Sequence, residues 1–140
     1  MKVLHLLINR NDETTNRPLG IHRVIDHKNR HMSCCWDLDI DEMRELIGGM
    51  IFFHRKKTEK SFLGGYVHDV HPIDMSPTYE GPYYTPVEED IGKRTRRIMF
   101  EFEITPEGRQ KTEWRGSNHI MSFCGGLVDV EQGVPKTHDE

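Results

Sequence analysis

The segment 95–105 alternates apolar and mostly charged side chains, and this alternation restricts the possible folds more than any other feature. Its apolar positions are Ile98, Phe100, Phe102 and Ile104, and between them lie Arg97, Met99, Glu101 and Glu103. Successive side chains of a β-strand point to opposite faces, so the pattern predicts a strand with one buried face. The segment therefore indicates a chain rich in β structure.

Four further segments have the character of strands, at residues 2–8, 50–54, 62–73 and 120–130. The pair Gly64-Gly65 near the start of one strand indicates a bulge or a close approach of another backbone. A strand-like stretch also precedes Trp36. The sequence therefore predicts five or six strands in all.

The clearest predicted helix covers residues 40–47. Asp39 is a favourable N-cap residue, and Glu42 three positions later completes a capping box. The pair Gly48-Gly49 is expected to end this helix. Apolar residues at helical spacing predict a second, short helix around residues 20–28.

Helices that lie between strands of an otherwise antiparallel set predict an α+β fold. We expect a small, mixed, partly closed β-barrel of five to six strands with one or two helices, because closure removes exposed sheet edges. The 140 residues fit one domain. Residues 1–131 are expected to form it, with 132–140 as a polar C-terminal tail.

Charge and hydropathy exclude some classes of function. The formal net charge is −4, so the chain lacks the strongly basic character of a general nucleic-acid-binding protein. No apolar run approaches the roughly 20 residues of a membrane span, and no membrane partner is expected. Three cysteines, two of them adjacent, do not resemble a disulfide framework, which favours a reducing, cytoplasmic compartment.

Motifs that carry catalysis are missing from the sequence. There is no Gly-x-Ser-x-Gly elbow and no phosphate-binding loop, and Cys124 lies in an apolar strand where a buried thiol is the common outcome. We therefore predict no catalytic residue, no cofactor and no metal. His68 and His71 are three residues apart on a predicted strand, which places them on opposite faces.

A cluster of histidines and cysteines keeps a hydrolase or nuclease open as an alternative. These residues are His22, His27, His31, Cys34 and Cys35, within fourteen positions. Such a density of soft ligands could hold zinc, although the spacing matches no known zinc finger. A second alternative is a protein-interaction factor that uses the Tyr-rich loop 74–92, because tyrosines are favoured at interfaces.

The two tryptophans are candidates for stacking on a flat ligand. Trp36 directly precedes the predicted helix cap, and Trp114 lies in a polar stretch without apolar neighbours. An aromatic face stacks on nucleic-acid bases with little preference for sequence. Asn118 and His119 follow Trp114 and could form hydrogen bonds to the edge of a base.

The stretch from Gly48 to Ile73 resembles the centre of PUA-like domains, the group that includes the EVE, ASCH and YTH domains. It combines a glycine stop, an apolar strand, a basic turn and a glycine-containing strand. Ser61, Phe62 and Gly64 are similar to the Ser-x-Phe-x-Gly motif of YTH domains, although one residue shorter. The resemblance implies a pseudo-barrel with an aromatic cage for modified bases, with Trp36 as its first wall.

The sequence therefore favours a small binding module whose pocket holds a plain or modified base, or a similar flat ligand. The bases would belong to single-stranded DNA or RNA, or be flipped out of a duplex. The residues expected at the pocket are Asn9, Arg10, Trp36, Ser61, Phe62, Trp114, Asn118 and His119. The residues expected to contact phosphate are Lys56, Lys57 and Lys60.

Overall fold

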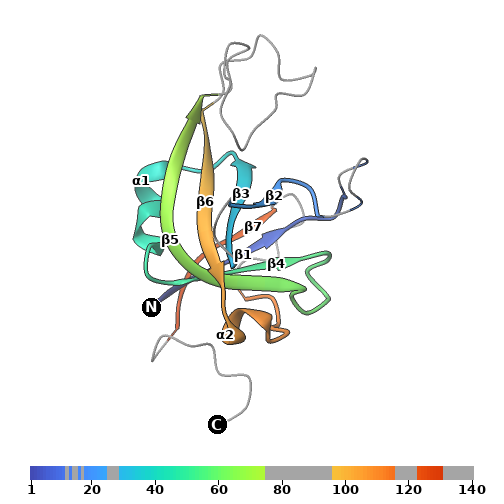
Figure 1. The fold of residues 1–140 in the computed structure, drawn as a ribbon. Helices are drawn as coiled ribbons and strands as arrows, with labels where there is room; N and C mark the ends of the chain where they lie inside the picture. Colours follow the sequence, from blue (N-terminus) through green and yellow to red (C-terminus); the bar gives the residue numbers. More distant parts are fainter. Residues whose placement is uncertain are drawn as a thin grey trace.

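All strands of the described chain pair into one mixed sheet, accompanied by two short helices, so the fold is α+β (Figure 1). The computed structural model describes residues 1–11, 13, 16, 18–24, 29–74, 96–115 and 123–130. In chain order the elements are β1 (Lys2–Leu7), β2 (Ile21–Arg23), β3 (Arg30–Trp36), α1 (Ile40–Met43), the 3-10 turn η1 (Arg44–Leu46), β4 (Met50–His54), β5 (Leu63–Asp74), β6 (Arg96–Ile104), α2 (Pro106–Arg109) and β7 (Cys124–Asp129).

Among the described residues the sheet has seven strands in the order β2-β3-β6-β5-β4-β1-β7, so the predicted five or six strands were too few. Strands β1 and β4 pair in parallel, and every other neighbouring pair is antiparallel. The connection between the parallel strands contains β2, β3 and α1, as a parallel pair requires a long crossover. This crossover puts the end of β1 near the β2–β3 hairpin.

One face of the sheet, here called the core face, carries the main hydrophobic cluster. The alternation predicted for residues 95–105 is confirmed, because Phe100 and Phe102 are fully buried there. Leu4, Leu6 and Phe53 reach the same cluster from β1 and β4. The opposite face, here called the outer face, carries the alternate residues of each strand.

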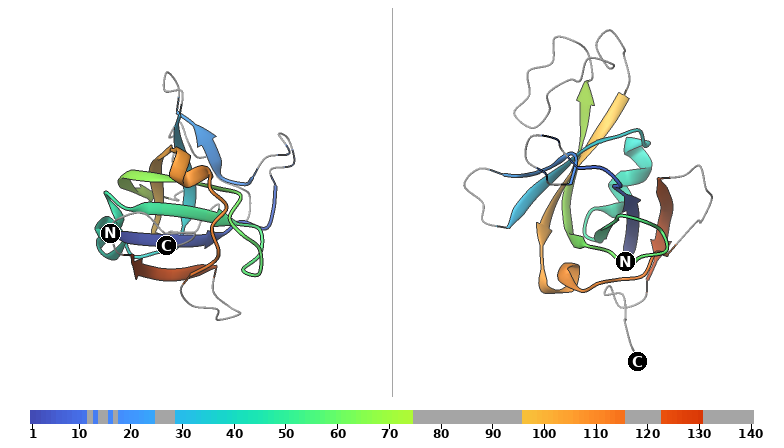
Figure 2. Two further views of the ribbon diagram at one scale, coloured as in Figure 1. Left: turned by 90° about the horizontal axis from the view of Figure 1, so that it is seen from below. Right: turned by 90° about the vertical axis from the view of Figure 1, so that its right-hand side faces the viewer.

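The sheet is strongly curled: the upper parts of β5 and β6 stand upright in Figure 1, whereas β1 and β4 run across the view, and Figure 2 shows the same sheet from two further sides. Trp36 at the end of β3 contacts Phe123 just before β7, with ring centroids 5.4 Å apart. Strands β6, β5, β4 and β1 separate β3 from β7 in the sheet order. In the part of the chain that is described, β2 and β7 remain edges, so closure into a barrel is not confirmed.

Helix α1 begins where its capping box predicted. Asp39 accepts a hydrogen bond from the backbone N–H of Glu42, and η1 extends the helical stretch to Leu46. The predicted helix around 20–28 was wrong for Ile21–Arg23, which forms β2 and pairs with β3. Gly20, with φ of +82°, turns the chain there, and its carbonyl accepts a hydrogen bond from the Cys34 N–H. Pairing with β3 therefore outweighs the helical spacing of the apolar residues in this segment.

The close backbone approach predicted at Gly64-Gly65 is confirmed. A Cβ on Gly64 would meet the Phe52 ring, the Ile51 carbonyl and the Gly108 carbonyl. Gly108 belongs to α2, which Thr105 caps by accepting from its N–H. Because Gly64 and Gly108 have no side chain, α2 packs directly against the start of β5.

A bulge in β5 overturns the expectation that His68 and His71 point to opposite faces. The register with β6 shifts between Val67 and Asp69, which inserts one residue and resets the alternation. His68 Nε2 lies 3.0 Å from Glu103, and His71 Nε2 lies 2.9 Å from Glu101. Two residues apart on β6, these carboxylates share the outer face, so both histidines lie on it.

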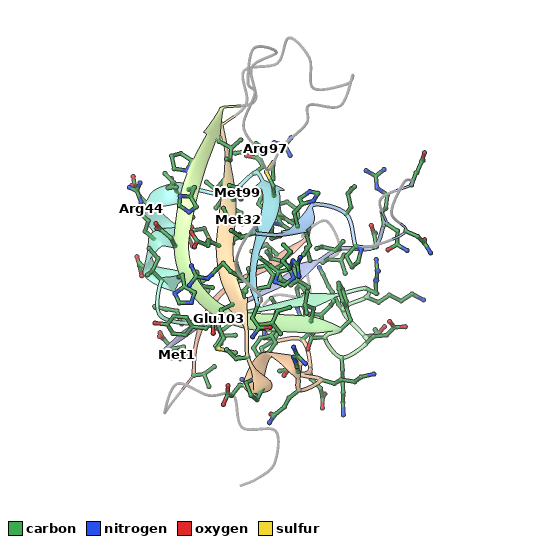
Figure 3. The ribbon with its side chains drawn as sticks, viewed as in Figure 1. Met1, Met32, Arg44, Arg97, Met99 and Glu103 are labelled. Carbon is green, nitrogen blue, oxygen red and sulfur yellow. A yellow bond between two sulfur atoms is a disulfide. The ribbon has the colours of Figure 1, made fainter. Side chains whose placement is uncertain are left out.

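Figure 3 shows the outer face of β3 and β6, with Met32 and Met99 side by side and Glu103 further along β6. Met32 and Met99 form a small buried cluster with Ile73. No helix among the described residues has the length and apolar character needed to cross a bilayer. The predicted tail 132–140 and nearly all of the Tyr-rich loop 74–92 lie outside the described residues.

Candidate functional site

A cavity of about 200 Å³ opens where the end of β1 passes the end of β3. Three of the residues expected from the sequence, Asn9, Arg10 and Trp36, line it together. The remaining lining residues are Leu7, Ile8, Leu19, Cys34 and Cys35. The cavity thus combines an apolar wall with one aromatic ring, one amide and one guanidinium.

Backbone hydrogen bonds hold the walls of the cavity in place. The Ile8 N–H donates to His54 at 2.8 Å, which continues the β1–β4 pairing by one residue. Leu19 N–H donates to the Arg10 carbonyl at 3.1 Å, so the chain returns beside residues 8–10. The Cys34 N–H then donates to Gly20 at 2.9 Å, which joins this return to β3.

The ring of Trp36 is fixed at the cavity wall. Its indole Nε1–H donates to Ser33 Oγ at 2.9 Å, and Ser33 is fully buried. Phe123 packs against the ring at 5.4 Å. With its single donor engaged, Trp36 offers a ligand an aromatic surface for stacking and no hydrogen bond.

Arg55 connects the rim of the cavity to the basic turn between β4 and β5. Its Nη1 donates to the carbonyls of Ile8 at 3.4 Å and Arg10 at 3.3 Å. Its guanidinium lies 4.7 Å from the centroid of the Phe62 ring. Sequence reasoning missed Arg55 as a positioning residue, and its place directly beside Lys56 in a charged turn was the available signal.

Ser61 and Phe62, expected at the pocket, do not line the cavity. Ser61 is buried, and its hydroxyl accepts from Thr112 N–H at 2.9 Å and reaches the Gln110 carbonyl at 3.5 Å. The Thr112 carbonyl accepts in turn from Ser61 N–H. Ser61 therefore fastens residues 110–112 to the start of β5, while Phe62 packs against the main hydrophobic cluster.

Trp114 also lies away from the cavity, against the outer face of β1 and β4. Its ring is 5.8 Å from His5 and 5.1 Å from His54, the second contact being edge-on. Phe52 stacks on His5, with ring centroids 5.3 Å apart. The two tryptophans thus do not form one cage, and Asn118 and His119 lie outside the described residues.

His5 and His54 form a fully buried pair that sequence reasoning did not single out. His54 Nδ1 lies 2.9 Å from the Glu59 carbonyl, so this nitrogen carries the hydrogen. His54 Nε2 is then the acceptor for His5 Nδ1–H, and His5 Nε2 is left as a lone pair with no hydrogen-bond partner among the described residues. The signal for this pair was a histidine within each of two apolar strands.

Burial sets the charge state of this pair. Desolvation, and then the neighbouring His54 and Arg115, lower the pKa of His5 from 6.5 to about 3. Desolvation also lowers the pKa of His54, against the opposing effect of its bond to the Glu59 carbonyl. Both imidazoles are therefore neutral at pH 7.

The lysines expected to contact phosphate lie in the turn between β4 and β5. Lys56 and Lys60 are exposed. Lys57 places its ammonium 5.4 Å from the Trp114 ring centroid, a cation–π contact on the outer face. The turn therefore presents exposed positive charge directly after the strand that ends at His54.

The cysteines differ from the sequence-based expectation. Cys34 and Cys35 are joined as a disulfide between neighbouring residues at the end of β3, where they form part of the cavity wall. Burial raises the pKa of the Cys124 thiol, which disfavours the reactive thiolate. Within the described part of segment 22–35, no three donor side chains gather as a metal site would require.

Comparisons with protein-family models, with curated proteins and with solved structures give no match to this chain.

Proposed function

We propose that the chain is a binding module that takes one nucleic-acid base, or a flat ligand of similar size, into the cavity between β1 and β3. The observation that carries this proposal is that Asn9 and Arg10, which follow β1, line one cavity together with Trp36 at the end of β3. The proposal includes a PUA-like fold whose curled sheet encloses this cavity as a partly closed barrel.

The size and chemistry of the cavity support a single flat ring system. Its volume of about 200 Å³ is below the roughly 300–1,000 Å³ of pockets for drug-sized ligands. Trp36 supplies a stacking surface. The Asn9 amide can donate to and accept from the edge of a ring, as base recognition requires. Arg10 adds a positive charge at the same wall.

The position of Arg55 indicates that a nucleotide, which carries a phosphate, fits the cavity better than an uncharged ring system does. Its guanidinium is bonded to the cavity wall at Ile8 and Arg10, and Lys56 follows it in the chain. A phosphate attached to a base in the cavity would therefore meet positive charge from Arg10 and from this turn. The net charge of −4 disfavours binding along a long duplex, so a single-stranded or flipped base fits better.

The decisive experiment is fluorescence anisotropy with labelled single-stranded DNA and RNA, carrying plain and modified bases, at two salt concentrations. Trp36→Ala should weaken binding by about 1–3 kcal/mol, the usual contribution of stacking one base. Trp36→Phe keeps an aromatic face and should retain part of the affinity. Trp114→Ala, a change of the same size away from the cavity, is the matched control.

Equal affinities for the wild-type protein and the Trp36→Ala variant, with folding intact by circular dichroism, would exclude the cavity as the binding site. Base-dependent binding with a shallow salt dependence would show that stacking outweighs phosphate contacts. Failure of every oligonucleotide to bind would refute the nucleic-acid part of the proposal.

A further inference from the structure

We propose that Asp69, His71 and Glu101 bind one divalent transition-metal ion, with Zn²⁺ as the best fit, on the outer face of β5 and β6. One donor atom of each residue lies within 4.8 Å of the others. None of the three residues lines the cavity between β1 and β3. The inference is therefore independent of the proposed function.

The distances between donor atoms suit a tetrahedral ion. His71 Nε2 lies 2.9 Å from Glu101 Oε1 and 3.9 Å from Asp69 Oδ2. Ligands held about 2.0–2.2 Å from Zn²⁺ lie roughly 3.3–3.5 Å apart at the corners of a tetrahedron. These two separations bracket that value, so small side-chain movements would seat an ion once His71 Nε2 has lost the hydrogen that it donates to Glu101. Imidazole with carboxylates is a ligand set that zinc accepts, and water would complete the coordination.

The backbone holds these ligands together by register and spacing. Asp69 and His71 are two residues apart on β5, which puts both on one face of the strand. Asp69 is the register partner of Glu101 on β6. The bulge between Val67 and Asp69 creates this arrangement by shifting the register of the strand.

A pair of like charges in direct register is unfavourable in a sheet, yet Asp69 and Glu101 occupy such positions. Both side chains are partly exposed, at 51% and 21%, and Asp69 Oδ1 accepts a hydrogen bond from the Val70 N–H, which leaves Oδ2 on the side of His71. A cation between them would turn the repulsion into coordination. The juxtaposition is the observation that favours a metal over an ordinary surface ion pair.

Arg30 on β3 does not cancel the negative charge of this site. It forms an ion pair with Glu101 Oε2, which leaves Oε1 facing His71. It also lies 3.8 Å from Glu103. One guanidinium is therefore shared by two carboxylates. Together, Arg30, Glu101, Glu103 and Asp69 carry a net charge of −2 when the neighbouring histidines are neutral.

The carboxylate of Glu101 is oriented for coordination by Arg30 on β3. Arg30 Nη1 donates to Oε2, so this oxygen is fixed and Oε1 stays on the side of His71. Ligands are oriented by such surrounding groups in established metal sites.

The test is isothermal titration of chelator-treated protein with Zn²⁺, together with thermal unfolding in the presence and absence of the ion. The wild-type protein should bind Zn²⁺ at this site and unfold at a higher temperature with it, because an ion that binds only the folded state stabilises it. Asp69→Asn and His71→Gln should each weaken binding at least about tenfold. Asp69→Asn leaves the Arg30–Glu101 pair intact, so it is the variant least able to disturb folding.

The matched control is the neighbouring pair His68 and Glu103, which has the same chemistry on the same strands. His68→Gln and Glu103→Gln should keep the affinity within about threefold of the wild type. Equal Zn²⁺ affinity in wild-type and Asp69→Asn protein would overturn the proposal, and so would the absence of any Zn²⁺ binding by the wild type. Loss of affinity in the control variants as large as in Asp69→Asn would also overturn the assignment to these three residues.

Discussion

His5 Nδ1 lies 2.7 Å from His54 Nε2 in the buried layer between β1, β4 and Trp114. The bond to the Glu59 carbonyl fixes which nitrogen of each ring carries hydrogen. Burial keeps both rings neutral, because a proton on either ring would place a charge in this desolvated layer, and a proton on His54 Nε2 would also force His5 into its other tautomer. The pair therefore ties the stability of the fold to pH.

We expect the free energy of unfolding to fall as the pH is lowered from about 6.5 toward 3. In this range the unfolded chain takes up a proton at His5, whose pKa is then 6.5, while the folded chain does not until its pKa of about 3. Each pH unit in that window costs about 1.4 kcal/mol for this one group. Urea unfolding at pH 7.5, 5.5 and 4.5 measures the slope.

The variant His5→Phe tests the origin of this slope. It should lose about 1–3 kcal/mol at pH 7.5, because His54 Nε2 no longer has a donor, but show a shallower dependence below pH 6.5. His22→Asn, at an exposed position, should keep the wild-type slope. A wild-type slope in His5→Phe would contradict the assignment.

Trp114→Ala should destabilise the protein by about 2 kcal/mol, less than the roughly 3–5 kcal/mol typical of a fully buried aromatic residue. The ring covers His5 and His54 and is itself half-buried. Its removal should leave binding in the cavity between β1 and β3 unchanged. Thermal unfolding measures the loss of stability, and fluorescence anisotropy on the same sample measures the binding. Loss of binding at unchanged stability would contradict both expectations.

Ser61→Ala should reduce the free energy of unfolding by about 1–3 kcal/mol, since the buried Thr112 N–H would lose its acceptor. Affinity for oligonucleotides should not change, because Ser61 does not line the cavity. Thr58→Ala in the neighbouring exposed turn should stay within about 0.5 kcal/mol of the wild type. A loss of affinity with full stability would instead return Ser61 to the binding site.

Gly108→Ala should prevent stable folding or cost more than about 3 kcal/mol. Its new methyl group would overlap the backbone of Gly64 and Gly65, and neither chain can retreat without breaking the contact between α2 and β5. Gly126→Asn serves as the control, because that position has open space and a positive φ that Asn tolerates. Denaturant unfolding of both variants measures the difference, and equal stabilities would refute the close contact.

The candidate site was only partly visible in the sequence. Asn9, Arg10 and Trp36 were expected together and do share a cavity, whereas Ser61 and Trp114 were assigned to the same pocket and lie elsewhere. Residue type suggested each of them as a ligand contact. The face on which each one lies depends on strand register, which residue type does not encode.

The sequence by itself determined the elements whose signals are local. Alternation predicted β6, the capping box predicted the start of α1, and paired glycines predicted the close approach at Gly64. Each of these depends on a few neighbouring residues, so one stretch of chain contains the whole cause.

Only the tertiary structure decided what depends on distant partners. The cavity forms because β3 lies near the end of β1, and His5 is buried because it packs against His54. The bulge after Val67 brings His71 beside Glu101. Ile21 formed a strand because β3 offered an edge to pair with. Pairing, register and curvature are set by contacts between segments far apart in sequence, and their energies outweigh the local preference of a short segment.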